Sequence, residues 1–164
     1  MQSLITMKKR LIFFLVALAL ISVGVYFSLS KPASSQGRLE ADRADYDFGT
    51  IPMNGGNVTY EFALENKSGE PVTIEEVSTS CMCTTAFVSH QDHNLGPFGM
   101  SGHNIQRKAN VTVQPGERMI VKAVFDPAAH GPAGAGSVSR TIYLSTNSKT
   151  QPTVNLAFTA NVAL

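Results

Sequence analysis

The chain has 164 residues, of which 43% are hydrophobic and 15% are charged, and its formal net charge is +1. This length accommodates one ordinary domain and an additional segment. When the basic cluster Lys8, Lys9 and Arg10 is set aside, 10 basic residues remain against 12 acidic ones. A nucleic-acid-binding protein would need a basic face, so we expect no nucleic-acid partner.

Residues 1–30 account for the additional segment. The basic cluster precedes Leu11 to Leu29, an apolar run without ionisable side chains that as a helix would span roughly 28 Å, close to the hydrocarbon thickness of a bilayer. We therefore expect a cytoplasmic N-terminus over residues 1–10 and a transmembrane signal anchor over residues 11–30, with a cleaved signal peptide as the alternative. The positive-inside rule then places the remaining chain outside the cytoplasm, as a single-pass membrane protein, or as a secreted one after cleavage.

The rest of the chain divides into a stem and a domain. Residues 31–44 are small, polar and aperiodic, which predicts a flexible stem. From Asp45 onward, short segments alternate apolar and polar residues, as strands do. We expect strands at residues 46–51, 58–64, 72–77, 119–125, 141–144 and 153–162. About seven short strands with turn residues between them predict an all-β, immunoglobulin-like antiparallel β-sandwich over residues 45–164.

Two long segments, Thr85–Asn110 and Pro127–Gly136, interrupt the strand pattern. Long loops in a compact domain are usually functional or disordered. Neither segment contains a phosphate-binding loop, a nucleophile elbow or a zinc-protease motif. We therefore expect that the protein is not an enzyme.

An ordered set of motifs resembles a known family. The motifs are DFGTI at 47–51, SCMCT at 80–84, QPGE at 114–117, VFDP at 124–127 and RTIYLSTN at 140–147. In this order they resemble the bacterial family catalogued as domain of unknown function 1573, over residues 45–164. The resemblance implies an exported immunoglobulin-like sandwich without an established activity. This chain departs from the family's usual Cys-Gly-Cys-Thr, because Met82 replaces the glycine, and the segment that follows is longer, with GPFGMSGH inserted.

The cysteines and the inserted loop suggest a metal site. Residues i and i+2 of an extended strand point to the same side, so Cys81 and Cys83 can present both sulfurs together. Met100 and His103 supply a thioether and an imidazole, and neighbouring glycines allow the loop to bend back. Thiolate, thioether and imidazole together select Cu(I), with Zn(II) less well suited. We predict a Cu(I) site at these four residues.

Other interpretations of the same residues stay open. A disulfide between Cys81 and Cys83 would be strained, because the Cα atoms of such a strand pair lie roughly 6.5–7 Å apart, and would be easy to reduce. His90 and His93 are reserve metal ligands, whereas the isolated His130 is expected to be structural.

Three functions follow from these observations. The first expectation is a membrane-tethered, non-catalytic domain that binds an unknown protein or cell-envelope partner. The second is an extracytoplasmic Cu(I)-binding protein. The third is thiol-disulfide exchange at the two cysteines.

Overall fold

The computed structural model describes residues 34–103 and 107–164. Residues Ser34–Leu164 form one compact unit. The predicted cytoplasmic N-terminus and the predicted membrane segment at 11–30 lie outside the described residues. Within the described part of the chain, no helix is long and apolar enough to cross a membrane.

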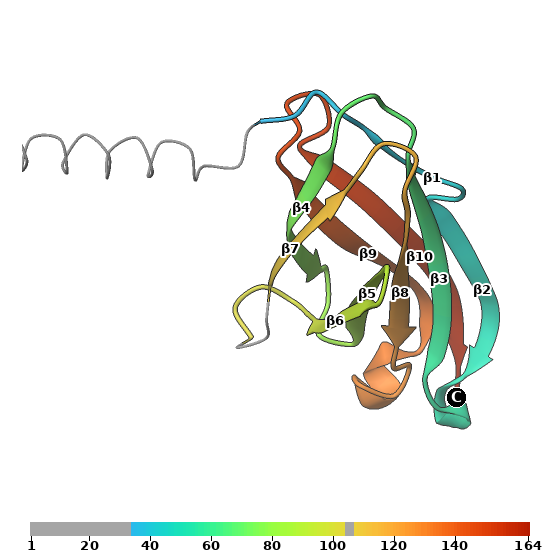
Figure 1. The fold of residues 1–164 in the computed structure, drawn as a ribbon. Coiled ribbons are helices and arrows are strands. Elements are labelled where there is room, and N and C mark those ends of the chain that lie inside the picture. The colour runs from blue at the N-terminus through green and yellow to red at the C-terminus, as the bar shows by residue number, and fades with distance from the viewer. Residues whose placement is uncertain (1–33, 104–106) are drawn as a thin grey trace, which may run out of the picture. The chain divides into compact units, whose positions relative to one another are not determined.

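The described residues form two five-stranded sheets, shown in Figure 1. In spatial order, the first sheet contains β1 (Leu39–Ala41), β3 (Val58–Asn66), β8 (Arg118–Phe125), β5 (Thr84–His90) and β6 (His93–Phe98). The second contains β2 (Asp45–Pro52), β10 (Thr153–Ala163), β9 (Gly136–Thr146), β4 (Val72–Thr79) and β7 (Lys108–Val113). Two short 3-10 turns, η1 (Met53–Gly55) and η2 (Gly131–Gly134), complete the regular structure. The prediction of an all-β sandwich is confirmed.

The core lies between the two sheets because alternate residues of each strand point inward. Phe62 and Leu64 of β3 and Val121 of β8 are fully buried, as are Leu156 and Phe158 of β10. Removal of these side chains from water is the main force that stabilises such a sandwich.

The second sheet is mixed, because β2 pairs in parallel with β10. The prediction of a purely antiparallel fold is therefore wrong for this pair. The chain crosses between sheets after Ala41, at the end of β1, and β2 then joins the edge beside β10 in the same direction. Alternating polarity reveals a strand but does not give the direction of its partner, so the sequence could not show this pairing.

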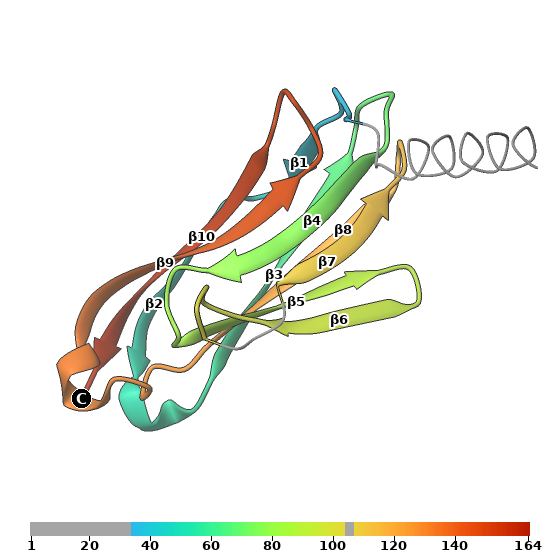
Figure 2. The ribbon, with the colours of Figure 1, turned by 90° about the vertical axis from the view of Figure 1, so that its left-hand side faces the viewer.

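The segment Thr85–Asn110 is largely strand, and its prediction as a long irregular loop is wrong. β5 and β6 form a hairpin in which His90 pairs with His93. Figures 1 and 2 show this hairpin at an edge of the sandwich. The turn contains Gln91 at a φ of 52°, a conformation that usually marks glycine or asparagine. A turn formed by such a residue escapes a search for glycine and proline.

The folded unit begins earlier than predicted, within the expected stem. Leu39 of β1 is only 2% exposed. The Gln151 side chain accepts a hydrogen bond from the Leu39 N–H at 2.8 Å and donates one to its carbonyl oxygen at 3.0 Å. Ser35 also forms an isolated bridge with Ser148. A three-residue strand with one large apolar side chain carries too short a pattern to be recognised from sequence.

Because Leu39 fills part of the core, the substitution Leu39→Ala should lower the free energy of unfolding by about 2–5 kcal/mol. Urea titration followed by circular dichroism measures this change. Arg38→Ala is the matched control, because Arg38 is exposed and only its backbone N–H bonds to Ser68. Equal stability of the two variants would show that residues 34–44 do not belong to the folded unit.

Candidate functional site

The two cysteines lie in the turn between β4 and β5. The Thr84 N–H donates to the Cys81 carbonyl oxygen at 3.2 Å and closes the turn. The buried Thr79 hydroxyl lies 3.0 Å from the carbonyl oxygens of both Cys81 and Thr84. Met82 at the tip is 58% exposed. The sulfurs therefore converge through a turn, and the prediction of an extended strand at this position is wrong.

Strand pairing brings a second loop to this turn. β5 pairs with β8, with Thr84 opposite Phe125, and the Asp126 N–H donates to the Cys83 carbonyl oxygen at 2.9 Å. The Asp126 carboxylate then accepts the Ala128 N–H at 2.9 Å, which orders the start of the loop. His130 in this loop places Nε2 at 3.3 Å from the Cys81 sulfur.

Strand β9 supplies a positive charge to the second thiol. Cys83 is 3% exposed, and the Arg140 Nε–H donates to its sulfur at 3.1 Å. The arginine is positioned by its neighbour Thr141, whose backbone N–H donates to the Ser80 hydroxyl at 2.9 Å and whose carbonyl accepts the Ser80 N–H at 2.9 Å. Cys83 thus has a cationic hydrogen-bond donor beside it, which favours the thiolate.

The ligand atoms of Cys81, Cys83 and His130 all lie within 4.8 Å of one another. Among residues 34–103 and 107–164, no other group of three histidines, cysteines or acidic residues gathers in this way. Donors that bind a common metal at about 2.0–2.3 Å lie roughly 3.5–4 Å apart. Small movements of these side chains would therefore allow them to share one ion.

The two thiols differ in acidity. Partial burial raises the pKa of Cys81, but hydrogen bonds from Cys83, a hydrogen bond from His130 and the charge of Arg140 outweigh it and bring the pKa to about 7. Burial and the contact with Cys81 raise the pKa of Cys83 above its ordinary value, against the lowering effect of Arg140. Cys81 is therefore the thiol that ionises first.

The structure does not place His103 in this cluster. Met100 forms an isolated parallel bridge with Thr79, and the Thr79 N–H donates to the Gly99 carbonyl oxygen at 3.2 Å. The inserted loop thus runs beside the strand that leads to Cys81. His103, however, is exposed, and the imidazole that joins the sulfurs is that of His130.

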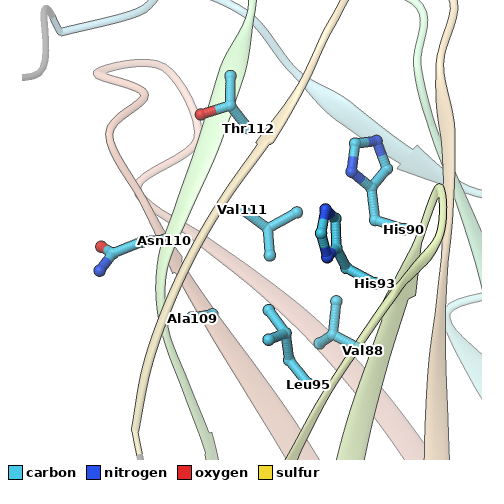
Figure 3. Close-up of a pocket in the computed structure, with 8 residues that line it drawn as sticks. All are labelled: Val88, His90, His93, Leu95, Ala109, Asn110, Val111 and Thr112. Carbon is cyan, nitrogen blue, oxygen red and sulfur yellow. The ribbon is translucent and has the colours of Figure 1, made fainter.

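The reserve ligands His90 and His93 are not part of this cluster, and Figure 3 shows them at the edge of a pocket. They line a cavity of about 290 Å³ between the β5–β6 hairpin and β7. The buried His90 places Nε2 at 3.1 Å from a Glu117 oxygen. The same oxygen accepts the Gln114 N–H at 2.8 Å. His90 therefore braces the turn before β8.

Sequence reasoning missed two members of the site. His130 is the one histidine outside the Cys81–His103 stretch, and Arg140 lies within a strand motif of the resembled family. A single sequence carries no signal for them, because the pairing of β5 with β8 is what brings them to the cysteines. Antiparallel pairing brings the residues just before one strand beside those just after the other, and this places 81–83 next to 126–130.

Comparison with known families identifies part of the chain. Residues 39–97 match the family described as "Protein of unknown function (DUF1573)". The predicted resemblance is confirmed over these residues, which include Cys81 and Cys83. His130 and Arg140 lie beyond the matched range. No curated protein matches the chain.

Among the solved structures similar to this chain, one has a TM-score above 0.5 and shares its fold. A protein of unknown function from Porphyromonas gingivalis W83 is 17% identical with a TM-score of 0.58, and the match covers 80% of this chain and 50% of that one. The chain thus spans half the length of that protein. The PapD-like domain 7 of human CEP192 is 16% identical with a TM-score of 0.44, over 82% of this chain and 89% of that one. The Vibrio cholerae VesB protease is 15% identical with a TM-score of 0.48, over 79% and 32%.

Because a thiolate reacts and a thiol does not, alkylation of the metal-free protein should begin at Cys81. Its rate should rise with pH around a midpoint near 7, since the Cys81 thiol is protonated below its pKa of about 7. Cys83 should react more slowly at every pH up to 8. Timed iodoacetamide labelling with fragment mass spectrometry measures both rates.

The variant His130→Ala should move the Cys81 midpoint to higher pH, because it removes a hydrogen bond that lowers the pKa. His103→Ala serves as the matched control and should leave the midpoint in place. Faster labelling of Cys83 than of Cys81 would contradict the assignment of the more acidic thiol.

Proposed function

We propose that this domain binds a soft metal ion, Cu(I) in preference to Zn(II), through Cys81, Cys83 and His130. The observation that carries the proposal is the convergence of two sulfurs and one imidazole nitrogen within 4.8 Å. Thiolates and imidazole are the donors that Cu(I) favours. Three donors also leave one side of the ion open for delivery or uptake.

The position of the site is consistent with transfer of an ion. Cys83 is buried, Cys81 is half-buried and His130 is exposed, so an ion would enter from the side of the imidazole. The two sulfur donors lie on the turn between β4 and β5. The imidazole donor lies on the loop after β8, which is joined to that turn by the hydrogen bond from the Asp126 N–H to the Cys83 carbonyl oxygen. A site of this kind holds its ligands close before the ion arrives, which lowers the entropic cost of binding.

The surroundings of the domain are part of the same proposal. We propose that residues 11–30 export the domain and tether it, or are cleaved after export, so that the immunoglobulin-like domain works outside the cytoplasm. Its role is non-catalytic: it carries or sequesters the ion and meets a protein of the cell envelope that supplies or receives it.

Titration of the 164-residue chain with Cu(I) against a competing chelator tests the proposal. Wild type should bind one Cu(I), and Cys81→Ser or Cys83→Ser should weaken binding by about 100-fold or more, since loss of even an outer-shell partner costs 10–100-fold. His130→Ala should weaken binding by at least about tenfold.

His103→Ala is the matched control for His130→Ala, because both imidazoles are exposed and only His130 contacts a thiol. This control should bind Cu(I) as wild type does. Binding weaker than micromolar in wild type, or equal losses in the two histidine variants, would contradict the proposed site.

The unequal thiols favour a second candidate, thiol-disulfide exchange. The Cys81 thiolate would attack a substrate disulfide, form a mixed disulfide and release one substrate thiolate. Cys83, once deprotonated, would then attack the Cys81 sulfur, which forms the Cys81–Cys83 disulfide and releases the second substrate thiolate. This sequence of steps begins with both cysteines in the thiol form.

For this candidate, Cys83→Ser should trap the mixed disulfide with oxidised glutathione, whereas Cys81→Ser should react at least about tenfold more slowly, because its remaining thiol is buried and less acidic. Intact mass spectrometry detects the added glutathione. Absence of an adduct in Cys83→Ser would remove this candidate and leave the metal site untouched.

A further inference from the structure

The charge next to the two sulfurs bears on which metal the site accepts. Arg140 donates its Nε–H to the Cys83 sulfur at 3.1 Å and one terminal N–H to the Ser139 carbonyl oxygen at 2.8 Å. These two hydrogen bonds fix the guanidinium at the edge of the cluster. The backbone of Arg140 is held in β9, where Arg140 pairs with the fully buried Phe158 of β10. An arginine keeps its charge at every physiological pH.

Within residues 34–103 and 107–164, no carboxylate forms an ion pair with Arg140. The ion pairs among the described residues involve Arg107 and Arg118 but not Arg140. Asp126, the acidic residue of the neighbouring loop, directs its carboxylate to the Ala128 N–H. The partners of the Arg140 charge are therefore the two sulfurs, with Cys83 the stronger partner and Cys81 the weaker one.

The balance of charges then favours one class of ion. Two thiolates and one guanidinium carry a net charge of −1, and His130 as a neutral ligand adds none. A monovalent ion makes the assembly neutral, whereas a divalent ion leaves one positive charge in a half-buried place. Uncompensated charge away from water is costly, and the guanidinium repels a divalent ion twice as strongly as a monovalent one.

We propose that Arg140 is a specificity-determining residue that makes the cluster of Cys81, Cys83 and His130 select monovalent Cu(I) over divalent Zn(II). This inference rests on the proposed function, because it assumes that these residues bind a metal. It adds a second cause of selectivity to the preference of the ligand types, which is weak because two thiolates and an imidazole also suit zinc.

The test compares two ions in the same protein. The affinities for Cu(I) and Zn(II) are each measured by chelator competition in the 164-residue chain at one pH, and their ratio is taken. Because both ions displace the same thiol protons, the cost of deprotonation cancels in the ratio. Wild type is compared with Arg140→Gln and Arg140→Met, which both introduce a neutral side chain of similar length. If one of the two variants does not fold, the other still gives the comparison.

In either neutral variant, the ratio of Cu(I) to Zn(II) affinity should fall by roughly tenfold to 100-fold, the size expected for one unit charge several ångströms away at a protein surface. Arg140→Lys should keep most of the wild-type ratio, because it keeps the charge. Arg118→Gln is the matched control, since it removes the same charge from the opposite end of β8, where Arg118 pairs with Glu65.

The outcomes separate this inference from the function on which it rests. If wild type binds neither ion, the proposed metal function fails. If wild type binds both ions and the ratio is unchanged in the neutral variants, the site stands and the role of Arg140 is overturned. A ratio that falls equally in Arg140→Lys and Arg140→Gln also overturns it, because the hydrogen-bond geometry rather than the charge would then set the preference.

Discussion

The pairing of β5 with β8 is the constraint on which the site depends. It places the start of one strand opposite the end of the other, so the loops that precede and follow them must meet. The hydrogen bond from the Asp126 N–H to the Cys83 carbonyl oxygen continues this pairing by one step beyond the strands. The pairing of the backbones therefore brings the two loops close together, and the side chains of Cys81 and His130 then need only point toward each other.

The second sheet also affects the cysteine turn, through a charged side chain. β9 contributes Arg140, whose contact with Cys83 reaches from the second sheet to the turn that links the two sheets. The cysteine turn is thus held between two independent hydrogen-bond systems. Its thiols differ in burial and acidity because one faces the solvent and the imidazole while the other faces the core and the guanidinium. Two cysteines separated by one residue therefore differ in thiol acidity because different parts of the fold surround them.

Much of the fold could be predicted from sequence because the inward residues of β3 and β10 are nearly all apolar, so period-two alternation is clear. β5 could not be recognised because two of its inward positions are Thr84 and His90, polar residues whose side chains have hydrogen-bond partners in the fold. The sequence singles out the two cysteines, but the imidazole beside them in the structure is that of His130 and not that of His103. Proximity in sequence favoured His103, whereas strand register, which a single sequence does not reveal, decides for His130.

The position of β10 has a consequence for the order in which the domain assembles. β10 lies between β2 and β9 in the second sheet, so this sheet cannot be completed until residues 153–163 have been synthesised. Both sulfurs and His130 belong to residues 81–130 and are present well before that point. Arg140 lies on β9, which pairs with β4 on one side and with β10 on the other, so the strand that carries it is fully paired only when β10 docks. The thiols of a growing chain are therefore made before their guanidinium partner, and the second sheet is completed last.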